Sequence, residues 1–262
     1  MLRSLRKIRD FGLKTYISRK IHDAAPSLYQ DHLARSQDGF VETAYGVAMK
    51  ENWKDATFRM CVFGSHGRML SDYLGDFSKP FVFLDVGANQ GLYSLLAARN
   101  RHCRKAVAFE PVQATFEILR KNIAHNDLSG VISPVCAAVS DHAGAGEIRV
   151  FNGHSGAASL RAVDVANGTA ETIALVAAGE IGPMIPEDVD IVVKIDVEGH
   201  EETVIEEILK LRQSNRLRAL FFEVDSRWVD GKHLEDRLRD GGFTDFRRLG
   251  RSEHYDVLAL HP

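Results

Sequence analysis

Two carboxylates and a glycine-rich turn occur at a spacing that suits the binding of a nucleoside. The turn DVGANQG runs from Asp85 to Gly91, and Glu110 follows nineteen residues later in the segment AFEP. Glycines such as Gly87 let the backbone approach a ligand closely, and a carboxylate at the end of the next strand can accept both hydroxyl groups of a ribose. These residues therefore predict a nucleoside site.

The same turn argues against a phosphate ligand. A dinucleotide fingerprint reads GxGxxG and directs backbone N–H groups at a pyrophosphate, whereas Asn89 stands here where a second glycine would be expected. Asp85 at the strand tip suits an amine rather than a phosphate. A nucleoside with an amino-acid tail and no phosphate is S-adenosylmethionine, so we predict this cofactor. Ser140 or Asp141, which end a later strand, could hydrogen-bond its adenine, or could equally be turn residues.

A charged strand supplies a second group of reactive side chains. Residues 191–202 read IVVKIDVEGHEE, in which Lys194, Asp196 and Glu198 alternate with apolar residues. A strand inside an α/β sheet is covered on both faces and should be apolar throughout. The charges are explained if this strand ends at the ligand site, because open α/β sheets bind ligands at the carboxyl ends of their strands. Since a buried ammonium needs a partner, we expect Lys194 to pair with Asp85 or Asp196.

These side chains suit the transfer of a methyl group to a hydroxyl. Methyl transfer from a sulfonium is an in-line displacement, and an alcohol becomes a good nucleophile when a base removes its proton. The candidate bases lie at or just after strand ends: Asp196, Glu198, His200 and Glu223. Glu198 could instead stabilise a helix start, and His200 could instead face solvent. The three carboxylates together could hold a divalent ion, but we favour a site without metal.

The acceptor site is less clearly marked by the sequence. Polar and aromatic residues that could contact an acceptor lie outside the strand ends: Trp53, His66, Arg68, His154, Ser155 and Trp228. We favour surface positions for the polar residues, because turns with such compositions are common on surfaces. We favour core positions for the two tryptophans, whose large apolar area is usually buried.

The elements that must position these groups alternate along the chain. From Phe81 onward, apolar strand segments alternate with amphipathic helical segments such as EETVIEEIL. This alternation predicts a doubly wound, mostly parallel sheet, and the final segments FTDFRRLG and YDVLALHP predict an antiparallel hairpin at one edge. Residues 57–64 are predicted to form a strand, and residues 131–141 are predicted to form another.

The N-terminal part of the chain predicts an extension beside this domain. We expect residues 1–56 to form a helical extension or cap, and residues 57–262 to form the main domain. Residues 1–23 carry apolar side chains at helical spacing with basic residues between them. Such a helix could contact a membrane surface peripherally, but we favour its packing on the domain.

Composition limits the partners and the compartment. The 262 residues carry a formal net charge of −3, and the three cysteines lack metal-ligand spacing. These features argue against a nucleic-acid partner, structural zinc and a disulfide framework. No apolar run approaches the roughly 18 residues of a membrane span, and the N-terminus lacks the apolar region of a secretory signal. We therefore predict a cytoplasmic protein.

Five segments, in this order, resemble one known family. FLDVGANQGLYSLLAA, AFEPVQATFEILRKNI, AAVSDHAG, HSGAASL and VVKIDVEGHEE are similar to segments of the FkbM family of S-adenosylmethionine-dependent methyltransferases, across about residues 57–225. The resemblance implies a class I methyltransferase (Rossmann-like) fold with a seven-stranded sheet, and methyl transfer to a hydroxyl, often on a sugar or polyketide. It also implies that the turn residues Asp85, Gly87, Asn89 and Gly91 hold the methionine end and that Glu110 holds the ribose.

Residues and resemblance together predict an O-methyltransferase acting on a hydroxyl of a saccharide or glycolipid-type metabolite. One alternative is an NAD-dependent dehydrogenase, although the turn lacks the phosphate glycines. Another is a methyltransferase-like module that holds the nucleoside without turnover, which only an assay separates from an enzyme. Nucleic-acid methylation is a third, but the sequence has neither a basic main domain nor an NPPY motif for a flipped base.

Overall fold

The computed structural model describes residues 38–262, apart from residues 66–67, 152–154, 158–167 and 251–252. The helix predicted for residues 1–23 and the candidate residues His66 and His154 therefore lie outside the described residues. Within the described ranges, no helix combines the length and apolarity needed to cross a membrane.

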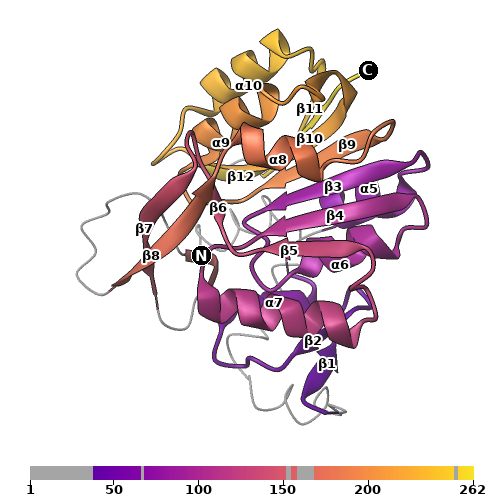
Figure 1. The fold of residues 1–262 in the computed structure, drawn as a ribbon, viewed down its shortest axis with the longest axis vertical. Coiled ribbons are helices and arrows are strands. Elements are labelled where there is room, and N and C mark those ends of the chain that lie inside the picture. The colour runs from indigo at the N-terminus through magenta and orange to yellow at the C-terminus, as the bar shows by residue number, and fades with distance from the viewer. Residues whose placement is uncertain (1–37, 66–67, 152–154, 158–167, 251–252) are drawn as a thin grey trace, which may run out of the picture.

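A seven-stranded sheet forms the centre of the molecule, in the order β11-β12-β10-β9-β3-β4-β5 (Figure 1). The strands are β3 (Phe81–Val86), β4 (Cys103–Phe109), β5 (Ile132–Val135), β9 (Asp190–Ile195), β10 (Leu217–Asp225), β11 (Asp245–Leu249) and β12 (His254–Leu260). The first five of these are parallel, whereas β12 runs antiparallel to both β10 and β11. The predicted fold class and the edge hairpin are confirmed.

Helices cover both faces of this sheet, so its central strands are apolar on both sides. One face packs against α8 (Ala178–Ile181), α9 (Glu201–Leu209) and α10 (Gly231–Asp240) through Ile181, Val204 and Leu234. The other face packs against α4 (Ala56–Phe63), α5 (Met69–Asp76), α6 (Leu92–Arg99) and α7 (Gln113–His125). Figure 1 shows α8, α9 and α10 on one side of the sheet and α6 and α7 on the other.

The strand predicted for residues 131–141 is divided between two sheets. Residues Ile132–Val135 form β5 of the central sheet, whereas Ala138–Val139 form β6 of a separate three-stranded sheet. That sheet has the order β6-β8-β7, with β7 at Gly144–Val150 and β8 at Thr169–Val176. The division follows from pairing, because β6 bonds to β8 and not to β4. After β5 the chain therefore leaves the central sheet and enters the three-stranded sheet.

The strand predicted for residues 57–64 is wrong, because this segment forms helix α4. Asp55 caps its start and accepts a hydrogen bond from the Phe58 N–H at 2.8 Å. Gly64 ends the helix in the left-handed conformation, with φ of 70°. Such caps stabilise both ends of a helix and outweigh the weak strand preference of aromatic and β-branched residues.

The described residues before α4 form a small hairpin rather than a helix. Its strands are β1 (Phe40–Glu42) and β2 (Ala48–Lys50), paired antiparallel. The side chains of Asn122 on α7 and of Asn126 at the C-cap of α7 bond to the backbone of β2. Met49 of the hairpin shares a core with residues of β3 and α4. The boundary predicted after residue 56 stays a prediction.

Candidate functional site

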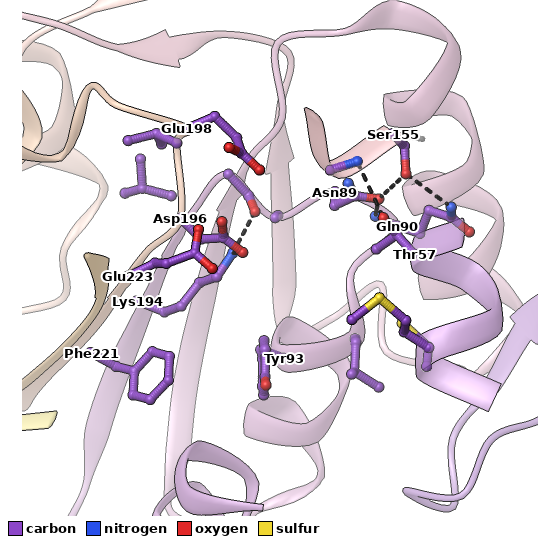
Figure 2. Close-up of a pocket in the computed structure, with 18 of the residues that line it drawn as sticks. Thr57, Asn89, Gln90, Tyr93, Ser155, Lys194, Asp196, Glu198, Phe221 and Glu223 are labelled. Atoms are coloured by element: carbon purple, nitrogen blue, oxygen red, sulfur yellow. Dashed lines mark hydrogen bonds and ion pairs between the residues drawn. The ribbon is translucent and has the colours of Figure 1, made fainter. Parts of the chain in front are cut away.

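The cavity lies at the carboxyl ends of the central strands, where the strand order reverses. From β3 the chain proceeds to β4 and β5 on one side and later returns to β9 and β10 on the other. In open α/β sheets this reversal leaves a crevice that binds ligands. A cavity of about 970 Å³ occupies it here, lined by residues that follow β3, β4, β9 and β10 (Figure 2).

The turn after β3 packs directly on the end of β9. Gly87 has φ of 74°, and a Cβ atom there would lie 2.0 Å from the carbonyl oxygen of Asp196. Gly91 has φ of 93°, and its Cβ would meet Leu119 at 2.4 Å. Both positions therefore require glycine. Asn89 adopts a positive φ of 51° between them and lines the cavity with Gly87.

Glu110 presents a buried carboxylate to the cavity at the end of β4. Its two oxygens accept the N–H groups of Asn89 and Val112, each at 2.9 Å. Burial nevertheless raises the pKa of Glu110 to about 7, against the lowering effect of these bonds. Because a carboxylate has about four acceptor positions, two remain available for the hydroxyl groups of a ribose.

Asp85 lies behind the cavity wall rather than in it. Its side chain is fully buried, and one carboxylate oxygen accepts the Ser94 hydroxyl at 2.6 Å. The other oxygen lies 3.4 Å from the Lys194 ammonium and has no hydrogen bond among the described residues. Asp85 is absent from the cavity lining, so it reaches a ligand only through the residues in front of it.

Lys194 links the turn to the charged end of β9. Its ammonium donates to the carbonyl oxygen of Gly87 at 2.5 Å and lies 3.4 Å from carboxylate oxygens of both Asp85 and Asp196. Both partners expected from the sequence therefore lie beside it. Burial alone would lower the pKa of Lys194, but the carboxylates of Asp196 and Asp85 outweigh this effect and raise it. The lysine is thus a fixed cation beneath the cavity.

Three carboxylates gather at the ends of β9 and β10. Asp196, Glu198 and Glu223 each place an oxygen within 4.8 Å of the others. Figure 2 shows Asp196 and Glu223 beside Lys194, with Glu198 above them. Burial, followed by the charges of Asp196 and Glu223, raises the pKa of Glu198 to about 8. Such a set could bind a divalent ion, and equally could act on a proton.

His254, which the sequence analysis missed, completes this cluster from β12. Its Nε2 atom bonds to Glu223, and its Nδ1 atom lies 3.4 Å from a carboxylate oxygen of Asp225. The hydrogen bond with Glu223 raises the pKa of His254 to about 9, so the ring is cationic at neutral pH. The sequence predicts that the terminal hairpin lies at one edge of the sheet. It does not give the register between β10 and β12, and this register places His254 opposite Asp225.

The remaining candidates follow β9 and β6 in the chain. His200 lines the cavity, and its Nε2 atom lies 3.3 Å from the hydroxyl of Ser140. Ser140 is buried behind His200, whereas Asp141 is exposed and bonds to His142 at 2.6 Å. Neither Ser140 nor Asp141 belongs to the described lining, which includes Ala138 and Val139 instead.

A second missed residue, Asp55, organises the opposite wall. Its carboxylate accepts hydrogen bonds from Gln90 Nε2 at 2.9 Å and from Ser155 N at 2.7 Å. The Ser155 hydroxyl in turn donates to Asn89 at 2.9 Å. Ser155 lines the cavity and is thereby joined to both the turn and α4 (Figure 2). The sequence signal for Asp55 is an N-cap residue before a helical segment, but the apolar residues of that segment also suit a strand.

The other candidates for contact with an acceptor differ in whether they line the cavity. Arg68 lines the cavity at its outer edge, where its side chain is 70% exposed and lies 3.4 Å from Asp72. Trp53 packs edge-on against Phe58, and Trp228 packs partly buried against the core beside α10. Neither tryptophan belongs to the described cavity lining.

Comparison with known proteins identifies the family of this chain. The Methyltransferase FkbM domain matches residues 85–244, which is more than half of the chain. The chain belongs to the FkbM methyltransferase family. The match runs from Asp85 through the charged strand to the start of β11, and so includes the turn, Glu110 and the carboxylate cluster.

The similarity to individual proteins is narrower. The chain is 44% identical over 64 residues to Methyltransferase sdnD of Sordaria araneosa, a match that covers 24% of this chain and 24% of that protein. The matched part thus spans about a quarter of that relative. Among solved structures, the METTL16 MTase domain has a TM-score of 0.51 at 12% identity, covering 97% of this chain and 81% of that one. The M. jannaschii tRNA m1G37 methyltransferase has a TM-score of 0.49 at 13% identity, covering 85% and 54%.

The family to which this chain belongs is one of methyltransferases whose methyl donor is S-adenosylmethionine. The cavity fits this cofactor. Gly87 is too close to Asp196 for any side chain, and the glycine itself lines the cavity beside Asn89. Glu110 has free acceptor positions for a ribose, and apolar Ala138 and Val139 line the wall beyond it, where an adenine can pack.

Proposed function

We propose that the protein methylates a hydroxyl group of a saccharide or glycolipid-type metabolite. The observation that supports this proposal is the carboxylate cluster of Asp196, Glu198 and Glu223, which shares one cavity with the cofactor turn. A hydroxyl is a weak nucleophile until a base removes its proton, whereas many neutral nitrogen acceptors are nucleophilic without such a base. A cavity with several carboxylates at the transfer site suits the former.

Within this proposal the backbone at Gly87 and Asn89 holds the methionine end, and Glu110 holds the ribose. The bound cofactor supplies an electrophilic methyl group on a sulfonium. Lys194 fixes the turn through its bond to the Gly87 carbonyl and neutralises the buried charge of Asp85. Excluding water from this part of the cavity strengthens these interactions.

Glu223 is the base that the surroundings favour. Asp196 is already paired with the Lys194 ammonium, which lies 3.4 Å from one of its carboxylate oxygens. Glu198, with a pKa of about 8, is largely protonated at neutral pH. Burial raises the pKa of Glu223, and cationic His254 holds it in place while one oxygen stays available. The acceptor proton then moves to that oxygen of Glu223.

Nucleic-acid methylation is less well supported by the cavity. Phosphate backbones bind through several lysine or arginine contacts. Here the transfer end of the cavity carries Asp196, Glu198, Glu223 and Asp256, and the lining cations are Lys194, His254 and the outer Arg68 among described residues. Lys194 is buried against carboxylates, so this wall repels rather than attracts a phosphate chain.

The proposal is tested by supplying radiolabelled S-adenosylmethionine to the protein with separated saccharide, glycolipid and RNA fractions. We expect label in a saccharide or glycolipid fraction, reduced strongly by Glu223→Gln. Binding of S-adenosylhomocysteine without transfer to any fraction would favour a binding module, and label confined to RNA would contradict the proposal. NAD serves as the control ligand and is expected not to bind.

A further inference from the structure

Beside the carboxylate cluster, the cavity continues into an apolar compartment. Five residues on α4, α5, α6 and β10 line this compartment: Met60, Phe63, Met69, Tyr93 and Phe221. Phe221 precedes Glu223 by two residues, so the two side chains lie on one face of β10, about 6–7 Å apart along the strand. Figure 2 shows Phe221 and Tyr93 together, at the end of the cavity away from Glu198 and Ser155.

This compartment is distinct from the part that the cofactor would use. The cofactor residues Gly87, Asn89 and Glu110 follow β3 and β4, whereas the compartment is lined mainly by α4, α5 and β10. Ligand cavities have volumes of about 300–1,000 Å³. The whole cavity, at about 970 Å³, is at the upper end of this range and has room for an acceptor beside the cofactor.

The lining selects against a purely polar occupant. A saccharide buried among Met60, Met69 and Phe221 would leave hydroxyl groups without hydrogen bonds, which is unfavourable. Methionine side chains are flexible and polarisable, and they adapt to hydrocarbon of varied shape. Polar groups also line the cavity, among them Glu223 and its partner His254, and Glu223 follows Phe221 on the same face of β10.

We propose that this compartment binds a hydrocarbon chain of the acceptor, whose hydroxyl-bearing head lies at Glu223. This inference rests on the proposed function and assigns the glycolipid-type acceptor rather than the free saccharide. The chain enters between α4 and α5, where Met60 and Met69 are partly exposed, and the head remains near the carboxylates.

The test is calorimetric titration of the full chain, saturated with S-adenosylhomocysteine, with alkyl β-glucosides below their micelle-forming concentrations. Methyl glucoside carries the head without a chain, and the hexyl, heptyl and octyl glucosides extend the chain one methylene at a time. Each buried methylene should tighten binding about fourfold until the compartment is filled. Equal binding of the methyl and octyl compounds would overturn the proposal.

Variants of the lining test where the hydrocarbon chain of the acceptor binds. Met60→Gln and Met69→Gln each replace a compartment wall with a polar side chain of similar size, and each should weaken octyl glucoside binding by about tenfold. Met184→Gln is the matched control, because Met184 packs against the core on the other face of the sheet. Unchanged octyl glucoside binding in both compartment variants would contradict the inference.

The same titrations separate failure of this inference from failure of the proposed function. Binding of S-adenosylhomocysteine reports that each variant is folded and should be unchanged in all three. Chain-dependent binding without methyl transfer to any hydroxyl would contradict only the proposed function. Transfer to a hydroxyl with no dependence on chain length would contradict only the compartment.

Discussion

At the scale of residues, burial and neighbouring charges give chemically similar carboxylates different surroundings in this site. Asp85 is fully buried beside Lys194, Glu110 accepts two backbone N–H groups, and Glu223 bonds to His254. The sequence indicated the carboxylates because charges at strand ends are unusual in a covered sheet. It could not assign their roles, since these depend on neighbours such as His254 that are distant in sequence.

Replacing Glu223 with glutamine removes the proposed base and keeps its shape. The turnover number should fall by about 10²–10⁴-fold, because glutamine cannot accept the proton of the acceptor hydroxyl. The affinity for S-adenosylhomocysteine should stay unchanged, since Glu223 lies on β10 and not in the cofactor turn. Glu202→Gln, on the exposed side of α9, is the control. A turnover number like that of the wild type would exclude Glu223 as the base.

The pKa of Glu110 predicts how cofactor binding depends on pH. Its folded-state pKa is raised to about 7, so the carboxyl is mostly neutral below that pH. A ribose hydroxyl donates best to the ionised form, so affinity for S-adenosylhomocysteine should fall as the pH drops through 7, by up to about tenfold per unit. Calorimetry from pH 5.5 to 8.5 measures this. Glu110→Gln should bind weakly at every pH, and a pH dependence retained in that variant would place its cause elsewhere.

The buried ion pair predicts a large effect on stability. Lys194→Met leaves the fully buried Asp85 without its cation, which should lower the free energy of unfolding by about 3–5 kcal/mol. Urea unfolding measures the change. Adding Asp85→Asn should recover part of the loss, because the uncompensated charge is removed. A double variant less stable than Lys194→Met alone would contradict this account of the pair.

At the scale of elements, the regular hydrophobic patterns predicted the strands and helices correctly. Segments that suit two kinds of structure were not predicted correctly. The strand–helix alternation and the terminal hairpin follow from hydrophobic period, which is the strongest signal in a sequence. Helix α4 was missed because two caps, Asp55 and Gly64, decided a segment whose apolar residues also suit a strand. The break between β5 and β6 was missed because both pieces are apolar and only their pairing partners differ.

The cap of α4 should matter more than an ordinary cap. Asp230 caps α10 with one bond to the Lys232 N–H, so Asp230→Ala should cost about 1 kcal/mol of stability. Asp55 is buried and also accepts from Gln90 and Ser155, so Asp55→Ala should cost about 3 kcal/mol or more. It should also weaken cofactor binding, because Asn89 loses the support of a fixed Ser155. Urea unfolding and calorimetry of both variants test this, and equal losses would contradict it.

At the scale of the whole molecule, the reversal of strand order gives the cavity two sides, and we propose that each has its own function. The ends of β3 and β4 supply the proposed cofactor side, whereas the ends of β9 and β10 and the start of β12 supply the carboxylates and His254. The sequence predicted this division because parallel strands bring their carboxyl ends to one edge. It did not predict the proposed acceptor side, because the helices α4, α5 and α6 and the strand β10 that line it are far apart in the chain.

The most direct measurement is where the methyl group goes. The protein is incubated with S-adenosylmethionine carrying a ¹³C-labelled methyl group and with the same saccharide, glycolipid and RNA fractions, and the product is examined by ¹³C NMR. The account predicts a methyl carbon bonded to oxygen, in a glycolipid-type product, that disappears with Glu223→Gln. A labelled methyl carbon bonded to nitrogen, in RNA or any other product, would contradict O-methylation.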